Sequence, residues 1–153
     1  MNRTKLLGTL RGLFIRDLGR FEGQLDLRIP PPPCKRKWWQ WLFPLRPEAI
    51  ILSTFTYIDK NGVRWEALPG TRINGLSSPW CLWRLMPPFE WRGIRASAIH
   101  DANCLYRNHP SWKVHQAMYR AMRCDNMSLL RAWTAWFLVR TFGPRFPGTL
   151  NEK

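Results

Sequence analysis

A turn near the middle of the chain, Asp59 to Gly62, lies between two runs of β-branched and aromatic residues. The first run covers residues 50–58 (IILSTFTYI) and the second covers residues 63–68 (VRWEAL). An Asn-Gly pair between two such runs is among the strongest short signals of a β-hairpin, because its residues readily adopt the positive φ of a tight turn. Residues 21–29 largely alternate apolar side chains with polar or small ones, which is the period of a half-buried strand. We therefore expect strands over residues 20–29, 50–58 and 63–68.

The second half of the chain carries the patterns of helices. Ser111 and Ser128 each precede a segment with helical spacing of apolar residues, and serine is a favoured helix N-cap. Gly143-Pro144 marks a helix end, because proline does not continue a helix. Helices are expected over residues 92–106, 112–123 and 129–142. We expect Trp133, Trp136 and Phe137 of the last helix to pack in the core and against other helices. Strands followed by helices predict an α+β fold, in which three helices pack on a small antiparallel sheet of about three or more strands.

The length of 153 residues is typical of one domain. We expect a basic N-terminal arm at residues 1–19, a single α+β domain at residues 20–145, and a C-terminal tail at residues 146–153. Twenty-four Lys and Arg residues outnumber ten Asp and Glu residues, which gives a net charge of +14. This excess predicts attraction to nucleic acid, to anionic lipid or to an acidic protein surface.

The four cysteines, Cys34, Cys81, Cys104 and Cys124, form no C-x-x-C pair. The usual spacing of a structural zinc site is therefore missing, and we expect the cysteines to act as small apolar residues or weak thiols. The sequence shows no run of about 18 apolar residues and no signal peptide with a small-residue cleavage site. We expect no membrane-spanning segment, and a location in a reducing cytoplasm.

An insertion rich in proline, tryptophan and positive charge occupies residues 30–48. Pro30 to Pro33 impose an extended conformation that ends the preceding strand. The next segment combines a basic cluster with three tryptophans: Lys35, Arg36, Lys37, Trp38, Trp39 and Trp41. This composition suits single-stranded nucleic acid, an anionic membrane surface, a protein partner, or packing onto the protein's own core. We expect contact with another protein subunit, with the tryptophans as anchors and the basic residues on the rim.

Several short motifs occur in a fixed order after the hairpin. They are residues 73–79 (INGLSSP), Pro87-Pro88, His100-Asp101, Ala121-Met122 and residues 139–143 (VRTFG). In this order and spacing the chain resembles the domain-of-unknown-function family 1353 of phages and prophages, over roughly residues 14–145. The resemblance implies a phage-encoded protein, located in the virion or in the cytoplasm of a bacterial host. The chain departs from the family at Asn74 and His115, which occupy positions where the family usually has aspartates.

His100 and Asp101 are the best candidates for catalytic residues if the protein is an enzyme, because histidine acts as a base or ligand and the carboxylate adds a hard donor. The polar positions of the family imply that Asn74, Ser77 and His115 lie near them in a polar cluster. Such a cluster could hold a transition metal through His100, Asp101 and His115, but an amide is a poor substitute for a carboxylate. We therefore expect no metal and no other cofactor. The alternative is that His100 connects its helix to the 74–79 loop by hydrogen bonds.

These features favour a non-catalytic interaction protein, which we expect to be a small virion component such as a tail, connector or accessory subunit. Its partners would be other phage structural proteins, with nucleic acid or an anionic surface as further partners of the basic residues. The first alternative is a metal-assisted hydrolase of peptidoglycan, lipid or nucleotide, centred on His100 and Asp101. The second alternative is a nucleic-acid-binding accessory protein, although no recognised nucleic-acid-binding signature occurs in the sequence.

Overall fold

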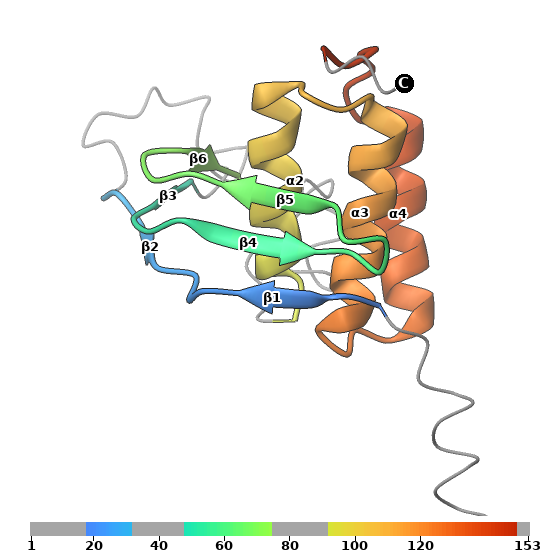
Figure 1. Cartoon of the computed structure of the whole chain (residues 1–153), viewed down its shortest axis with the longest axis horizontal. Helices are drawn as coiled ribbons and strands as arrows, with labels where there is room; N and C mark the ends of the chain where they lie inside the picture. The colour runs from blue at the N-terminus through green and yellow to red at the C-terminus, as the bar shows by residue number, and fades with distance from the viewer. Residues whose placement is uncertain (1–17, 32–47, 75–91, 150–153) are drawn as a thin grey trace, which may run out of the picture.

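The computed structural model describes residues 18–31, 48–74 and 92–149 of the chain. Short strands come first and three helices follow, which confirms the expected α+β class (Figure 1). The strands are β1 (Arg20–Glu22), β2 (Leu27–Arg28), β3 (Ala49–Ile51), β4 (Phe55–Ile58), β5 (Arg64–Ala67) and β6 (Arg72–Ile73). The helices are α2 (Ile94–Tyr106), α3 (Ser111–Cys124) and α4 (Leu129–Phe142). Within the described ranges, no helix combines the length and the apolar character that crossing a membrane requires.

The expected hairpin is present, since β4 and β5 pair antiparallel with Tyr57 opposite Trp65. The Asp59 carboxylate shapes the turn, because its Oδ1 accepts hydrogen bonds from the backbone N–H groups of Asn61 (2.8 Å) and Val63 (3.1 Å). Gly62 has a φ of 79°, a left-handed conformation that strains residues with a Cβ. The Asn-Gly signal therefore identified this turn correctly.

Two of the expected strands are each divided into two shorter strands. The segment predicted at residues 20–29 forms β1 and β2, and the segment predicted at residues 50–58 forms β3 and β4. The two breaks lie beside each other, since the Leu52 N–H donates to the Asp26 carbonyl (2.9 Å). Gly23, with a φ of 84°, turns the first segment at this level. The result is two three-stranded antiparallel sheets, β1-β4-β5 and β2-β3-β6, in place of one sheet.

The helices stack outward from the strands in chain order. α2 contacts β4, β5 and β6, α3 packs against α2, and α4 packs against α3. Figure 1 shows the three helices side by side, with the strands running across α2. Ala96, Ala98 and Ala102 on α2 are fully buried, and such small side chains let α2 lie close to its neighbours. Since α3 contacts both α2 and α4, it is the central helix of these three.

The helix starts differ in one detail from the expectation. Ser111 is the first residue of α3, and Pro110 occupies the N-cap position in its place. Proline suits this position because its φ is already fixed near the helical value and its missing N–H costs no helical hydrogen bond there. Ser128 is the N-cap of α4 as expected, but its side chain makes no capping hydrogen bond.

The core lies between the strands and the inner faces of α2 and α3. Its largest fully buried side chains include Phe55 and Tyr57 from β4, Ile99 from α2, and Met118 and Met122 from α3. Burying a side chain of this size stabilises the fold by ~2 kcal/mol relative to leaving it in water. The same two helix faces also bury a group of polar side chains.

Candidate functional site

α2 and α3 each place one buried histidine at their contact. His100 on α2 is 6% exposed, and His115 on α3 is 3% exposed. The rings face each other, with His100 Nε2 3.1 Å from His115 Nδ1. His115 shares the buried face of α3 with Met118 and Met122, so helix packing positions its ring.

The outer edge of each histidine ring has a hydrogen-bond partner of its own. His100 Nδ1 lies 3.2 Å from Asp101 Oδ1, an arrangement in which the ring nitrogen donates to the carboxylate. His115 forms a hydrogen bond with the backbone of Pro144, which can only accept because proline has no N–H. Since His115 Nδ1 faces His100, the donor to Pro144 is Nε2. Each ring therefore holds a proton on its outer nitrogen, His100 Nδ1 or His115 Nε2. The two inner nitrogens, His100 Nε2 and His115 Nδ1, face each other.

Asp101 also connects α2 to the end of β6. Its Oδ2 accepts a hydrogen bond from the backbone N–H of Asn74 (2.9 Å). The structure thus brings Asn74, His100, Asp101 and His115 into one chain of hydrogen bonds. Asn74 takes part through its backbone, so this bond does not depend on which side chain occupies the position. Asp101 makes the hydrogen bond that joins the helix to Asn74, and the rest of the 74–79 loop lies outside the described residues.

Cys104 joins the two histidines, although no sequence pattern had pointed to it. It lies one helical turn after His100 on α2, and its Sγ is 3.4 Å from His100 Nε2. Side chains four residues apart share one face of a helix, so this spacing was the available signal. His100, Cys104 and His115 each offer one donor atom, and these atoms all lie within 4.8 Å of one another. Asp101 contacts the opposite edge of the His100 ring and is not a member of this group.

The two histidines have pKa values shifted in opposite directions. Burial lowers the pKa of His100, but hydrogen bonds with Asp101 and Cys104 outweigh burial and raise it to about 9. Burial and the positive charge of His100 lower the pKa of His115 to about 4, and the hydrogen bond with Pro144 offsets only part of this. Without a metal, the pair therefore carries one positive charge at neutral pH, and the His100 ring bears it.

A second feature is the outer face of α4, where four large apolar side chains form a stripe. The stripe consists of Leu129, Leu130, Trp133 and Phe137, which are between 46% and 74% exposed. The rings of Trp133 and Phe137 stack, with centroids 5.4 Å apart and planes inclined by 14°. The expectation that these two residues pack into the core is wrong. Trp136, by contrast, is partly buried and contacts Tyr119 of α3.

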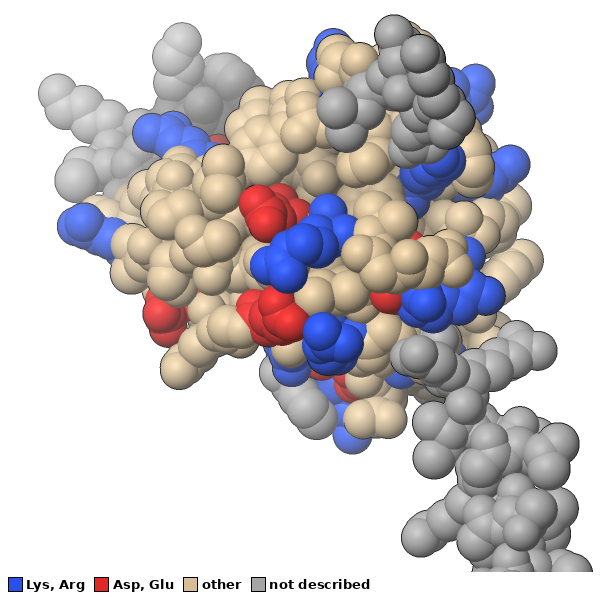
Figure 2. Space-filling view, in the orientation of Figure 1, with Lys and Arg blue, Asp and Glu red and all other residues tan. Residues whose placement is uncertain are grey.

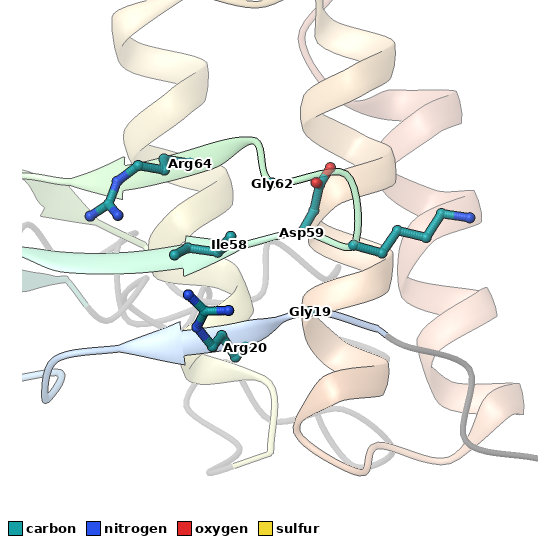
Figure 3. Close-up of a pocket in the computed structure, with 7 residues that line it drawn as sticks. Gly19, Arg20, Ile58, Asp59, Gly62 and Arg64 are labelled. Carbon is teal, nitrogen blue, oxygen red and sulfur yellow. The ribbon is translucent and has the colours of Figure 1, made fainter. Parts of the chain in front are cut away.

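A basic pocket lies where β1 meets the β4–β5 turn (Figure 3). Arg20 and Arg64 both line it, and both form ion pairs with Glu22, at 3.2 Å and 3.3 Å. The Asp59 carboxylate accepts hydrogen bonds from the backbone of the turn. The pocket therefore offers a ligand few charged groups that lack a partner within the protein. On the face shown in Figure 2, basic and acidic side chains are interspersed and do not gather into one basic patch. This face adds no support for nucleic-acid binding.

Several residues that the sequence singled out lie outside the described ranges. They are Ser77 of the polar cluster and the interaction residues Lys35, Arg36, Lys37, Trp38, Trp39 and Trp41. Their roles stay predictions.

The family model described as "Protein of unknown function (DUF1353)" matches residues 49–139, which is more than half of the chain. The chain belongs to this family. The match confirms the resemblance seen in the sequence motifs, over a narrower range than residues 14–145. It runs from β3 to near the end of α4, so His100, Cys104 and His115 of this DUF1353 member all lie inside it.

Two relatives of this DUF1353 protein occur in Sinorhizobium fredii. The uncharacterized protein y4jT is 33% identical over 109 residues, which cover 71% of this chain and 32% of y4jT. The uncharacterized protein y4iH is 33% identical over 99 residues, which cover 63% of this chain and 41% of y4iH. The chain therefore spans well under half the length of these curated relatives. No solved structure matches it.

Proposed function

We propose that this chain is a non-catalytic interaction protein that binds another protein subunit through the α4 stripe. The observation that carries the proposal is the exposure of these apolar side chains, with Leu130 at 74% and Trp133 at 51%. The apolar face of a helix usually packs inward, and a contiguous apolar patch left in water commonly marks an interface. The stripe lies on the helix that is farthest from the strands, where a partner can reach it.

The composition of the stripe suits a binding hot spot. Tryptophan is enriched in hot spots, and truncating such an anchor commonly costs ~2 kcal/mol or more of binding energy. Trp133 and Phe137 already stack on each other, so a partner meets a preformed aromatic surface and less side-chain entropy is lost on binding. Arg140 is exposed on the same side of the helix, which favours a partner with acidic groups around its apolar pocket.

We propose further that this partner belongs to a phage virion, in which the chain is a small tail, connector or accessory subunit. The support is the phage setting implied by the family resemblance, which is an argument from association and not from site chemistry. An assembled particle would also cover the stripe permanently, as obligate interfaces do.

Mass spectrometry of purified particles tests both parts of the proposal. The phage would encode the wild-type chain, the double variant Trp133→Ala/Phe137→Ala, or Trp112→Ala as a matched control. Trp112 on α3 is 53% exposed, close to the 51% of Trp133, but it lies outside the stripe. We expect the wild-type chain and the control in particles at equal copy number, and the double variant reduced at least ~10-fold, as the loss of two anchors predicts. Circular dichroism should show that both variants fold.

Two results would contradict this proposal. If the wild-type chain is missing from washed particles, the virion role is wrong. If the double variant enters particles as well as the control does, the α4 stripe is not the binding surface.

A second candidate function is metal-assisted hydrolysis, which the buried group of His100, Cys104 and His115 favours. A metal held by these residues would supply a nucleophile by lowering the pKa of a bound water to ~7. Asp101 would orient the His100 ring from its outer edge. Peptidoglycan, lipid or nucleotide hydrolysis that requires added metal and is lost in His115→Ala would support this candidate. Metal-loaded protein that turns over none of these substrates would count against it.

A further inference from the structure

We propose that His100, Cys104 and His115 bind a zinc ion that fastens α2 to α3. The proposal goes beyond the interaction function, because it concerns the buried contact between two helices and holds whether or not the α4 stripe binds a partner. Two of the three ligands come from α2 and one comes from α3, so the ion would crosslink neighbouring helices.

Two of the three donor separations are close to those around a tetrahedral zinc ion. With Zn–N at about 2.0–2.1 Å and Zn–S at about 2.3 Å, tetrahedral geometry places two nitrogens about 3.3–3.4 Å apart and a nitrogen and a sulfur about 3.5–3.6 Å apart. The observed separations are 3.1 Å between His100 Nε2 and His115 Nδ1, and 3.4 Å between His100 Nε2 and Cys104 Sγ. The three donor atoms lie within 4.8 Å of one another, so the remaining pair, Cys104 Sγ and the His115 nitrogen, would have to close by up to about 1 Å to admit the ion.

The hydrogen bonds on the far side of each ring favour a cation between the rings. Asp101 accepts from His100 Nδ1 and the Pro144 carbonyl accepts from His115, which leaves the lone pairs of the other two nitrogens directed at each other. Two such lone pairs repel at 3.1 Å unless a proton or a metal ion lies between them. A proton bonds covalently to only one of these atoms and hydrogen-bonds to its neighbours, whereas a metal ion would coordinate both nitrogens and the Cys104 sulfur. A carboxylate or backbone carbonyl behind each histidine is the usual support of histidines that bind metals.

The donor types select the metal. Ca²⁺ and Mg²⁺ prefer oxygen ligands, and none of the three donor atoms is an oxygen. A thiolate combined with two imidazole nitrogens suits Zn²⁺, which tolerates irregular angles because its filled d shell imposes no geometry. The missing C-x-x-C pair does not argue against such a site, since helix bundles can build metal sites from side chains on facing helices.

The metal content of the full-length protein is the first measurement. After incubation with Zn²⁺ and removal of excess metal by gel filtration, we expect about one zinc per chain by plasma mass spectrometry. Replacement with Co²⁺ should give the near-ultraviolet charge-transfer band of a cobalt–thiolate bond and the intense visible bands of a tetrahedral site. Zinc should also raise the melting temperature, because it binds the folded chain preferentially. Wild-type protein that retains no zinc would overturn the proposal.

Matched variants assign the ligands. Cys104→Ser should remove the charge-transfer band and weaken zinc binding at least ~100-fold, whereas Cys124→Ser should change neither property. Cys124 is the matched control because it is also partly buried, and its Sγ donates to the Gly19 carbonyl away from the histidines. Asp101→Asn keeps all three ligands and should weaken zinc binding ~10-fold through the His100 ring. Equal zinc affinity in Cys104→Ser and Cys124→Ser would overturn the assignment, and circular dichroism would verify that both variants are folded.

Discussion

Replacing Asp59 with alanine tests how the hairpin is joined to the helices. The Asp59 side chain is 4% exposed, and its Oδ1 accepts two hydrogen bonds from the backbone of the turn. Its Oδ2 lies 3.4 Å from Arg120 Nη1 on α3. One carboxylate therefore closes the β4–β5 turn and connects it to the helix that carries His115.

The expected loss of stability follows from these contacts. A hydrogen bond to a charged acceptor contributes ~1.5–3 kcal/mol when it is buried. The N–H groups of Asn61 and Val63 belong to exposed residues and can bond to water after the substitution, so ~1 kcal/mol for each bond is the appropriate value. Arg120 is 21% exposed, and loss of its ion pair adds up to ~1 kcal/mol. Asp59→Ala should therefore lower the free energy of unfolding by ~2–3 kcal/mol.

Urea unfolding followed by tryptophan fluorescence provides the measurement. Asp59→Asn keeps an oxygen that accepts both turn hydrogen bonds and loses only the ion pair, so it should cost ~1 kcal/mol. Lys60→Ala changes an exposed side chain in the same turn and should leave the free energy of unfolding within ~0.5 kcal/mol of wild type. A loss below ~1 kcal/mol for Asp59→Ala, or equal losses for the alanine and asparagine variants, would refute the assignment of the turn hydrogen bonds as the main contribution.

Two further predictions concern other polar groups. Burial raises the pKa of Asp125 from 3.8 to about 6, although the ion pair with Arg95 acts in the opposite direction. The folded state therefore binds more protons than the unfolded state between these pH values, so this group should make the free energy of unfolding fall as pH rises from 3.8 to about 6. Urea titrations at several pH values should show a weaker fall in Asp125→Asn, and an identical slope would contradict the shift. Tyr106→Phe removes a hydroxyl that accepts from the Leu68 N–H (3.0 Å) and contacts Thr71 Oγ1 (2.6 Å). It should cost ~1 kcal/mol in the same assay, and an unchanged urea midpoint would show that these bonds contribute nothing.

Local signals in the sequence were sufficient for the order and type of the main elements. The hairpin followed from Asn61-Gly62 because a turn depends on a few adjacent residues and their backbone conformations, here the positive φ of Gly62. The division of the long strands did not follow, because it depends on where Leu52 meets Asp26, a contact between segments 26 residues apart in the chain. Alternation of side chains continues through such a bend, so the pattern alone does not reveal it.

The candidate site was likewise only partly predictable from the sequence. His100 and Asp101 are adjacent and their motif drew attention to them, but Cys104 carries no motif of its own. Its role depends on the contact between α2 and α3, which brings His115 to the same point. The exposure of Trp133 was missed for a similar reason. An aromatic residue at helical spacing predicts a packed face, and only the position of neighbouring elements shows which face of α4 is covered.

The Pro144 carbonyl, which accepts a hydrogen bond from His115, directly follows the end of α4. The helix that bears the exposed stripe is therefore tied by its terminus to the histidine pair. A ligand that binds one region and moves this terminus would change the affinity of the other region for its own ligand. Thermodynamic reciprocity requires each ligand to change the affinity for the other by the same factor. If zinc raises the affinity of α4 for its partner tenfold, then the partner must raise the affinity of the chain for zinc by the same factor.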